Sequence, residues 1–190
     1  QFGRLSKATS AVRKARVVLL ADRPCWAFDY VARSLKARLS SRFEIKVKYV
    51  QLRPKLDPSE IDLLYVFFWG EQWYKQFSFE SEQVSKEVAS YRWALEERYG
   101  RLSSQEFVER HLSDCQLVVT PAQRLFRELS PLCEHVYVCS NGVEPSIFRA
   151  RGSRSGPLRI GWVGNPDDQC KGLRDIVLPA CEGRFVLRYT

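Results

Sequence analysis

The chain has 190 residues, of which 45% are hydrophobic, and its 30 lysines and arginines exceed its 22 aspartates and glutamates to give a net charge of +8. No run approaches the roughly 18 uninterrupted apolar residues that a membrane-spanning helix needs, so we expect no such helix. The basic balance favours an anionic partner, such as nucleic acid, anionic lipid or a phosphorylated substrate, but does not choose among them.

The first part of the chain alternates between strand and helix patterns. Residues 16–21 form a short apolar run that suits a strand buried on both faces. Apolar residues then recur every four positions, which predicts a helix with one buried face: Ala27, Val31, Leu35 and Leu39. Strands are predicted again at 44–50, where apolar and charged residues alternate, and at 61–68.

The alternation continues, although residues 71–100 give the weakest pattern. We expect a strand at 87–91 and the start of a helix at 94–98. Ser103 and Glu106 have the spacing of a capping box, which predicts a helix directly after Ser103. The remaining elements follow in order: a strand at 116–120, a helix at 122–129 and a strand at 136–139.

This order of elements predicts an α/β fold with a mostly parallel sheet and helices on both of its faces. Residues 149–157 are rich in Gly, Ser and Arg, which is typical of a surface linker. Beyond the linker we expect a strand at 158–163, a helix that carries Leu173, Ile176, Val177 and Ala180, and a further strand at 185–190. The sequence therefore predicts one complete domain, a linker and the first part of a second domain.

The six cysteines lie mostly in apolar runs, with no C-x-x-C pair and only two histidines to join them. A structural zinc site needs four soft ligands at close spacing, so we expect no metal site. Free thiols in a reducing compartment are the ordinary interpretation.

In a parallel sheet of this kind, ligands bind at the carboxyl ends of the strands. The residues expected there are polar and aromatic, which suits a sugar, because carboxylates bind its hydroxyl groups and a ring packs on its apolar face. The candidate acceptor-binding residues are Asp22, Trp26, Trp69, Tyr91 and Arg92. Turn residues are polar in every protein, so a purely structural role stays open for each of them.

An aromatic-rich segment, residues 67–79, has two functional interpretations, an acceptor platform and a membrane-facing patch. However, Phe67 and Phe68 continue a buried strand. We therefore favour a strand end followed by a loop that covers the core.

Two motifs flank the linker. Asn141-Gly142-Val143, with Phe148 after it, ends the first domain, and Gly164 with Lys171-Gly172 opens the second. In this order they resemble the crossover between the two domains of GT-B glycosyltransferases of the family 4 type. The resemblance covers the whole chain loosely and residues 135–183 specifically.

The resemblance implies two Rossmann-like domains, an N-terminal acceptor domain at 1–148 and, after the 149–157 linker, the start of a nucleotide-sugar domain at 158–190. It implies retaining transfer of a sugar from a nucleotide-diphospho-sugar to a saccharide or lipid-linked acceptor, with no metal or other cofactor and no catalytic residue yet assigned. The donor-binding residues that it implies are Gly164, Asn165, Lys171 and Gly172, with Lys171 on the diphosphate. Its glutamate pair would lie beyond Thr190, so we expect this chain to be an inactive fragment of an active parent.

Two alternatives stay open. Asn165 and the pair Tyr91-Arg92 stand where many family members have an arginine and a histidine, which permits a non-catalytic interaction domain of the same fold. A basic nucleic-acid-binding module is the other, but acidic residues lie between the basic ones and no recognised motif is present, so we do not expect nucleic acid as the partner. We expect a cytoplasmic location, with an anionic membrane surface as a further partner.

Overall fold

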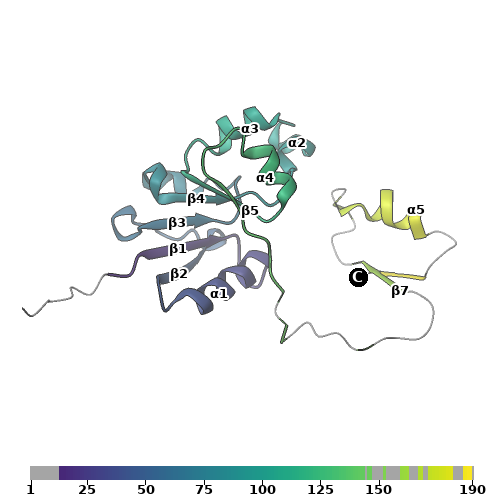
Figure 1. Ribbon diagram of the computed structural model, residues 1–190, viewed down its shortest axis with the longest axis horizontal. Helices are drawn as coiled ribbons and strands as arrows, with labels where there is room; N and C mark the ends of the chain where they lie inside the picture. The colour runs from purple at the N-terminus through teal and green to yellow at the C-terminus, as the bar shows by residue number, and fades with distance from the viewer. Residues whose placement is uncertain are drawn as a thin grey trace, which may run out of the picture. The chain divides into compact units, whose positions relative to one another are not determined.

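The computed structural model describes residues 13–143, 145–146, 152, 159–162, 167–168, 171–181 and 186–189. The chain divides into two units, Gln1–Gly142 and Val143–Thr190, and each is described by itself (Figure 1). The domain roles assigned above to 1–148, 149–157 and 158–190 stay predictions.

The first unit is built on a six-stranded sheet in which every pairing is parallel. The strands lie in the order β2-β1-β3-β4-β5-β6. Their bounds are β1 (Arg16–Ala21), β2 (Glu44–Tyr49), β3 (Leu63–Val66), β4 (Val84–Glu87), β5 (Leu117–Thr120) and β6 (Val136–Val138). The predicted α/β class with a parallel sheet is confirmed, and the arrangement is consistent with a Rossmann-like fold.

Four helices belong to this unit: α1 (Ala27–Leu39), α2 (Arg92–Leu95), α3 (Ser104–His111) and α4 (Gln123–Leu129). The predicted capping box begins α3, because the Ser103 hydroxyl accepts from the Glu106 N–H while the Glu106 carboxylate accepts from the Ser103 N–H. The helix α1 packs on Val17 and Leu19 of β1. The helices α3 and α4 pack on the opposite face of the sheet, in a cluster with Val118 and Val136.

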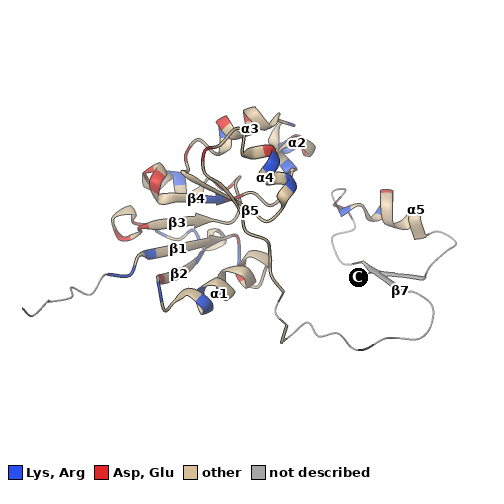
Figure 2. Cartoon of the chain, in the orientation of Figure 1, with Lys and Arg blue, Asp and Glu red and all other residues tan. Residues whose placement is uncertain are grey.

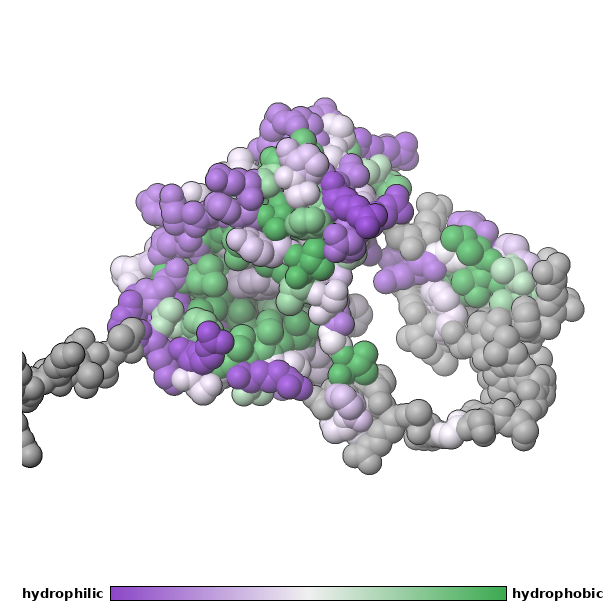
Figure 3. All heavy atoms as spheres, in the orientation of Figure 1, coloured by the Kyte–Doolittle hydropathy of each residue, from purple (hydrophilic) through white to green (hydrophobic). Residues whose placement is uncertain are grey.

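On the α1 side, β5 and β6 lie beyond the apolar cluster that α1 forms with the sheet. Leu117 and Val119 point to this side from β5, are half-buried and join none of the three core clusters, and Tyr137 of β6 is exposed. Apolar residues gather between α1 and α4 on the face shown in Figure 3.

The two crossovers into β3 and β4 contain short 3-10 turns in place of α-helices. These turns are Val50–Leu52 and Pro58–Glu60 before β3, and Trp73–Phe77 and Ser81–Gln83 before β4. A further turn, Glu97–Tyr99, follows α2. Because no α-helix lies between β2 and β3, the Glu44, Lys46 and Lys48 side chains on one face of this edge strand lie beside the loop that leads into β3.

The strand predicted at 87–91 is wrong in position, because β4 ends at Glu87. The polar residues Ser85 and Lys86 are fully buried in β4, so a pattern of apolar residues does not reveal it. The Lys86 ammonium is satisfied by the His111 carbonyl and the Asp114 carboxylate. The strand predicted at 61–68 is likewise shorter, at Leu63–Val66.

The aromatic segment 67–79 belongs to the core, as the sequence favoured. Phe67, Trp69 and Tyr74 are all buried. Trp69 packs edge-on against Trp93, whose ring stacks on Phe107 at 4.0 Å. These rings hold α2 and α3 to the end of β3.

The second unit contains a parallel pair of strands, β7 (Arg159–Trp162) and β8 (Val186–Tyr189). Between them a π-helical turn, Leu173–Val177, continues into α5 (Leu178–Cys181). This strand–helix–strand order agrees with the elements predicted at 158–190. Among all the residues described, no helix is both long and apolar enough to cross a membrane.

Candidate functional site

The strand order identifies where a ligand should bind in the first unit. From β1 the chain crosses to β2 on one side, and β3 then pairs with β1 on the other side. In doubly wound α/β proteins such a reversal marks the place where ligands bind, at the carboxyl ends of the two strands that flank it, which here are β1 and β3. The loop 22–26 follows β1 at this place, and residues 67–70 follow β3.

Asp29 fixes the shape of the 22–26 loop. Its side chain is 1% exposed and accepts hydrogen bonds of 2.8 Å from the Cys25 N–H, the Tyr49 hydroxyl and Arg33 Nε. Burial alone would raise the pKa of Asp29, but these three donors and the Arg33 charge hold it below its ordinary value. Cys25 has a φ of 58°, a left-handed conformation that the bond to Asp29 stabilises.

The anchored loop presents a cation, a ring and a carboxylate. Trp26 is 52% exposed, and the Arg23 guanidinium lies 3.8 Å from the centre of its ring. Asp22 is partly buried, and its Oδ1 atom is buried without a hydrogen-bond partner among the described residues. The two residues that the sequence favoured most, Asp22 and Trp26, thus share one loop at the carboxyl end of β1.

The other three acceptor candidates lie in different surroundings. Trp69 is 1% exposed and packs inside the aromatic core, so its ring has no face open to solvent. Tyr91 lies against Trp93 and under the Arg124 guanidinium, 5.0 Å from each. Arg92, the first residue of α2, forms an ion pair of 2.6 Å with Glu96, which follows the helix.

Sequence reasoning missed Glu87, the last residue of β4. Its carboxylate is 8% exposed and accepts a 3.0 Å hydrogen bond from the Tyr65 hydroxyl. Burial raises the pKa of Glu87, and the Tyr65 bond opposes this shift only in part. Within the described part of the chain, no cation pairs with Glu87. Glu87 would have been recognised had the end of β4 been predicted correctly, because it is then the last residue of an inner strand, at the carboxyl edge of the sheet.

The 22–26 loop offers groups that suit an uncharged polar ligand. The Trp26 ring, 52% exposed, provides an apolar surface, and the Asp22 carboxylate can accept a hydrogen bond from a hydroxyl group, although its unpartnered Oδ1 atom is buried. Glu87 retains its proton to higher pH than an ordinary glutamate, so it can donate as well as accept. Hydroxyl groups beside an apolar ring face are the features of a sugar.

In the second unit, Lys171 and Gly172 precede the helical segment. Lys171 is exposed, its N–H donates to the Asp168 carbonyl, and its own carbonyl accepts from Trp162 Nε1 at 3.4 Å. Gly172 has a φ of 63°, and its carbonyl accepts from the N–H groups of Ile176 and Val177. The other two predicted donor residues, Gly164 and Asn165, lie outside the described residues.

No known protein family matches this sequence, and no curated protein matches it either. Across the described residues, no three side chains of His, Cys, Asp or Glu gather as metal ligands would. Basic and acidic residues are interspersed over the elements of the first unit (Figure 2).

Proposed function

We propose that the chain belongs to a glycosyltransferase that moves a sugar from a nucleotide-diphospho-sugar to a saccharide or lipid-linked acceptor. The observation that carries this proposal is the 22–26 loop at the carboxyl end of β1, which Asp29 anchors through the Cys25 N–H and which carries Asp22, Arg23 and Trp26. An exposed ring on the same loop as a carboxylate suits a pyranose and its hydroxyl groups. The strand–helix–strand order of the second unit, with Lys171-Gly172 before the helix, supports a donor site.

The proposal gives each residue a physical role. Trp26 packs on the apolar face of the acceptor sugar, and Asp22 accepts a hydrogen bond from one of its hydroxyl groups. Lys171 meets the donor diphosphate as a point charge, and Gly164, Asn165 and Gly172 are the other residues proposed to bind the donor. No metal or other cofactor enters this scheme, and no catalytic residue is assigned.

Titration calorimetry of the parent protein with UDP- and GDP-sugars tests the donor site. A charge-assisted contact contributes about 1.5–3 kcal/mol, so Lys171→Ala should weaken donor binding about tenfold or more. Lys36→Ala, which removes an exposed lysine of α1, is the control and should bind as the wild type does. Absence of nucleotide-sugar binding by the wild type, or equal binding by Lys171→Ala, would contradict the proposed donor site.

Steady-state kinetics tests the acceptor loop. Trp26→Ala should raise KM for the acceptor and leave the donor affinity unchanged, because the ring is 52% exposed and joins none of the three core clusters of the described residues.

We extend the proposal to a cytoplasmic protein at the inner surface of the membrane, which the net charge of +8 supports.

A further inference from the structure

A cavity lies beside the edge strand β2. It has a volume of about 290 Å³ and extends from the amino ends of β1 and β2 to the loop that leads into β3. Its apolar lining includes Val18, Leu56 and Ile61, all buried. The charged residues around it are Arg16, Glu44, Lys46, Lys48, Lys55, Asp57 and Glu60.

The cavity exists because the crossover from β2 to β3 contains no α-helix. In a parallel sheet such a helix would cover β2 on this face. Here the Pro58–Glu60 turn and the residues before it occupy that place and leave space beside the strand. Leu56 and Ile61 from this loop pack on Val18 and Leu64 of the sheet and close the apolar floor.

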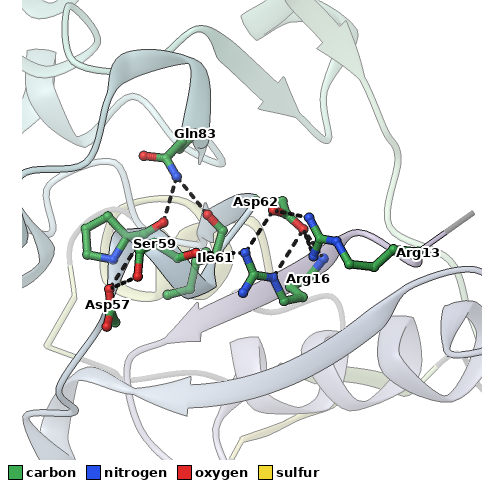
Figure 4. A network of polar contacts seen from close by, with 8 residues as sticks. Arg13, Arg16, Asp57, Ser59, Ile61, Asp62 and Gln83 are labelled. Atoms are coloured by element: carbon green, nitrogen blue, oxygen red, sulfur yellow. Dashed lines mark hydrogen bonds and ion pairs between the residues drawn. The ribbon is translucent and has the colours of Figure 1, made fainter.

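The wall of the cavity is held by a polar network that Figure 4 shows. The Asp62 carboxylate accepts hydrogen bonds from the Arg13 and Arg16 side chains and from the Arg16 N–H. The Gln83 amide donates to the carbonyls of Pro58 and Ile61 at 3.0 and 2.7 Å. These contacts fix the 58–62 end of the loop, and Trp73 Nε1 fixes its earlier part by donating to the Pro54 carbonyl at 3.1 Å.

Two of the lining lysines have no carboxylate bonded to them. Arg16 is bound to Asp62, and Lys46 forms a 3.5 Å ion pair with Glu44. The described residues supply no ion-pair partner for Lys48 or Lys55.

Two acidic groups remain at the rim. Asp57 lies near Lys55, but its carboxylate accepts its hydrogen bonds from the Ser59 N–H and hydroxyl. Glu60 is exposed. The rim therefore carries two lysines able to bind an anion above an apolar floor.

We propose that this cavity binds a small amphiphilic anion, with its apolar chain on Val18, Leu56 and Ile61 and its phosphate or carboxylate head on Lys48 and Lys55. A free phosphate would leave the apolar floor uncovered, and a neutral amphiphile would gain no charge-assisted contact from the two ammonium groups. The volume lies at the lower limit of small-molecule pockets, so it admits one short chain. This inference is independent of the proposed glycosyl transfer.

Calorimetric titration of the 190-residue chain with octyl phosphate, inorganic phosphate and octyl glucoside tests the inference. Octyl phosphate should bind measurably more tightly than either of the other two, because only it matches both the floor and the rim. The double variant Lys48→Ala/Lys55→Ala should weaken its binding about tenfold or more, whereas Lys48→Arg/Lys55→Arg should retain it. Lys36→Ala on α1 is the matched control, and far-UV circular dichroism verifies that each variant is folded.

Three results would overturn the assignment. These are no binding of octyl phosphate to the wild type, equal affinity in the double alanine variant, and inorganic phosphate or octyl glucoside binding as tightly as octyl phosphate. Nucleotide-sugar binding by the parent bears on none of them, so the two proposals can fail separately.

Discussion

Replacement of Asp29 tests whether this carboxylate holds the 22–26 loop in place. In Asp29→Ala, the Cys25 N–H and the Tyr49 hydroxyl lose their acceptor, and both lie in partly buried surroundings. An unsatisfied buried donor costs about 1–3 kcal/mol, so the two together should lower the free energy of unfolding by about 3 kcal/mol. The Arg33 side chain is 62% exposed and regains its hydrogen bonds from water, so Arg33→Ala should cost only about 0.5 kcal/mol.

Urea unfolding followed by tryptophan fluorescence measures this change. With a slope of about 2 kcal/mol per molar, the midpoint of Asp29→Ala should fall by about 1.5 M. Tyr49→Phe removes one of the two donors. The double variant Asp29→Ala/Tyr49→Phe should therefore lose about 1 kcal/mol less free energy of unfolding than the sum of the losses in the two single variants.

Acid conditions give a second test of the same carboxylate. The pKa of Asp29 is lowered in the folded protein, so its contribution is present above the unfolded-state pKa near 4 and is lost as pH falls below it. The difference in free energy of unfolding between wild type and Asp29→Ala should therefore become smaller below about pH 4. A loss under 1 kcal/mol at pH 7, or strict additivity with Tyr49→Phe, would refute the reasoning.

Two further predictions concern Glu87 and Gly172. Since the pKa of Glu87 is raised on folding, the native state binds its proton more tightly than the unfolded state and loses stability as pH rises above about 4.3. In urea titrations, the free energy of unfolding of Glu87→Gln should therefore rise relative to that of wild type between pH 4.5 and 7.5, whereas that of the exposed control Glu97→Gln should not. If the difference between Glu87→Gln and wild type stayed the same across this range, the raised pKa of Glu87 would be contradicted. An alanine at position 172 would have to keep a φ of 63°, and its Cβ would lie 3.0 Å from Ile176 Cδ1. Because both strain the backbone, Gly172→Ala should accelerate amide hydrogen exchange in residues 171–181. Gly142→Ala, where a Cβ meets nothing within 4 Å, should leave that exchange unchanged, and equal rates in both variants would refute the strain.

The strands and helices that the sequence predicted well are those whose burial follows one simple pattern. The continuous apolar run of β1 and the four-residue spacing in α1 each correspond to one way of packing on the sheet. The capping box at Ser103 was recognisable because its two hydrogen bonds are local. By contrast, β4 depends on Asp114 and the His111 carbonyl, which lie far along the chain and satisfy Lys86.

In the candidate site, too, the residues set by local sequence could be predicted, and those set by contacts between distant segments could not. Asp22 and Trp26 could be predicted because they come directly after the clearest strand. The support that Asp29 receives from Tyr49, and the pairing of Tyr65 with Glu87, require knowledge of which strands are neighbours. The cavity beside β2 could not be predicted, since it results from a missing helix and not from a motif.

The position of β1 has a consequence for how the chain acquires its structure. Arg16 of β1 pairs with Glu44, and Val17 of the same strand pairs with Leu63, so both neighbours of this early strand come much later in the sequence. Each pairing closes a long loop before it gains any contact energy, which makes such sheets slow to fold. During synthesis β1 leaves the ribosome before β3, so the backbone groups on one edge of this apolar strand stay unpaired until β3 follows. A chaperone that holds this segment should therefore raise the yield of the folded protein more than one that acts after β3 is complete.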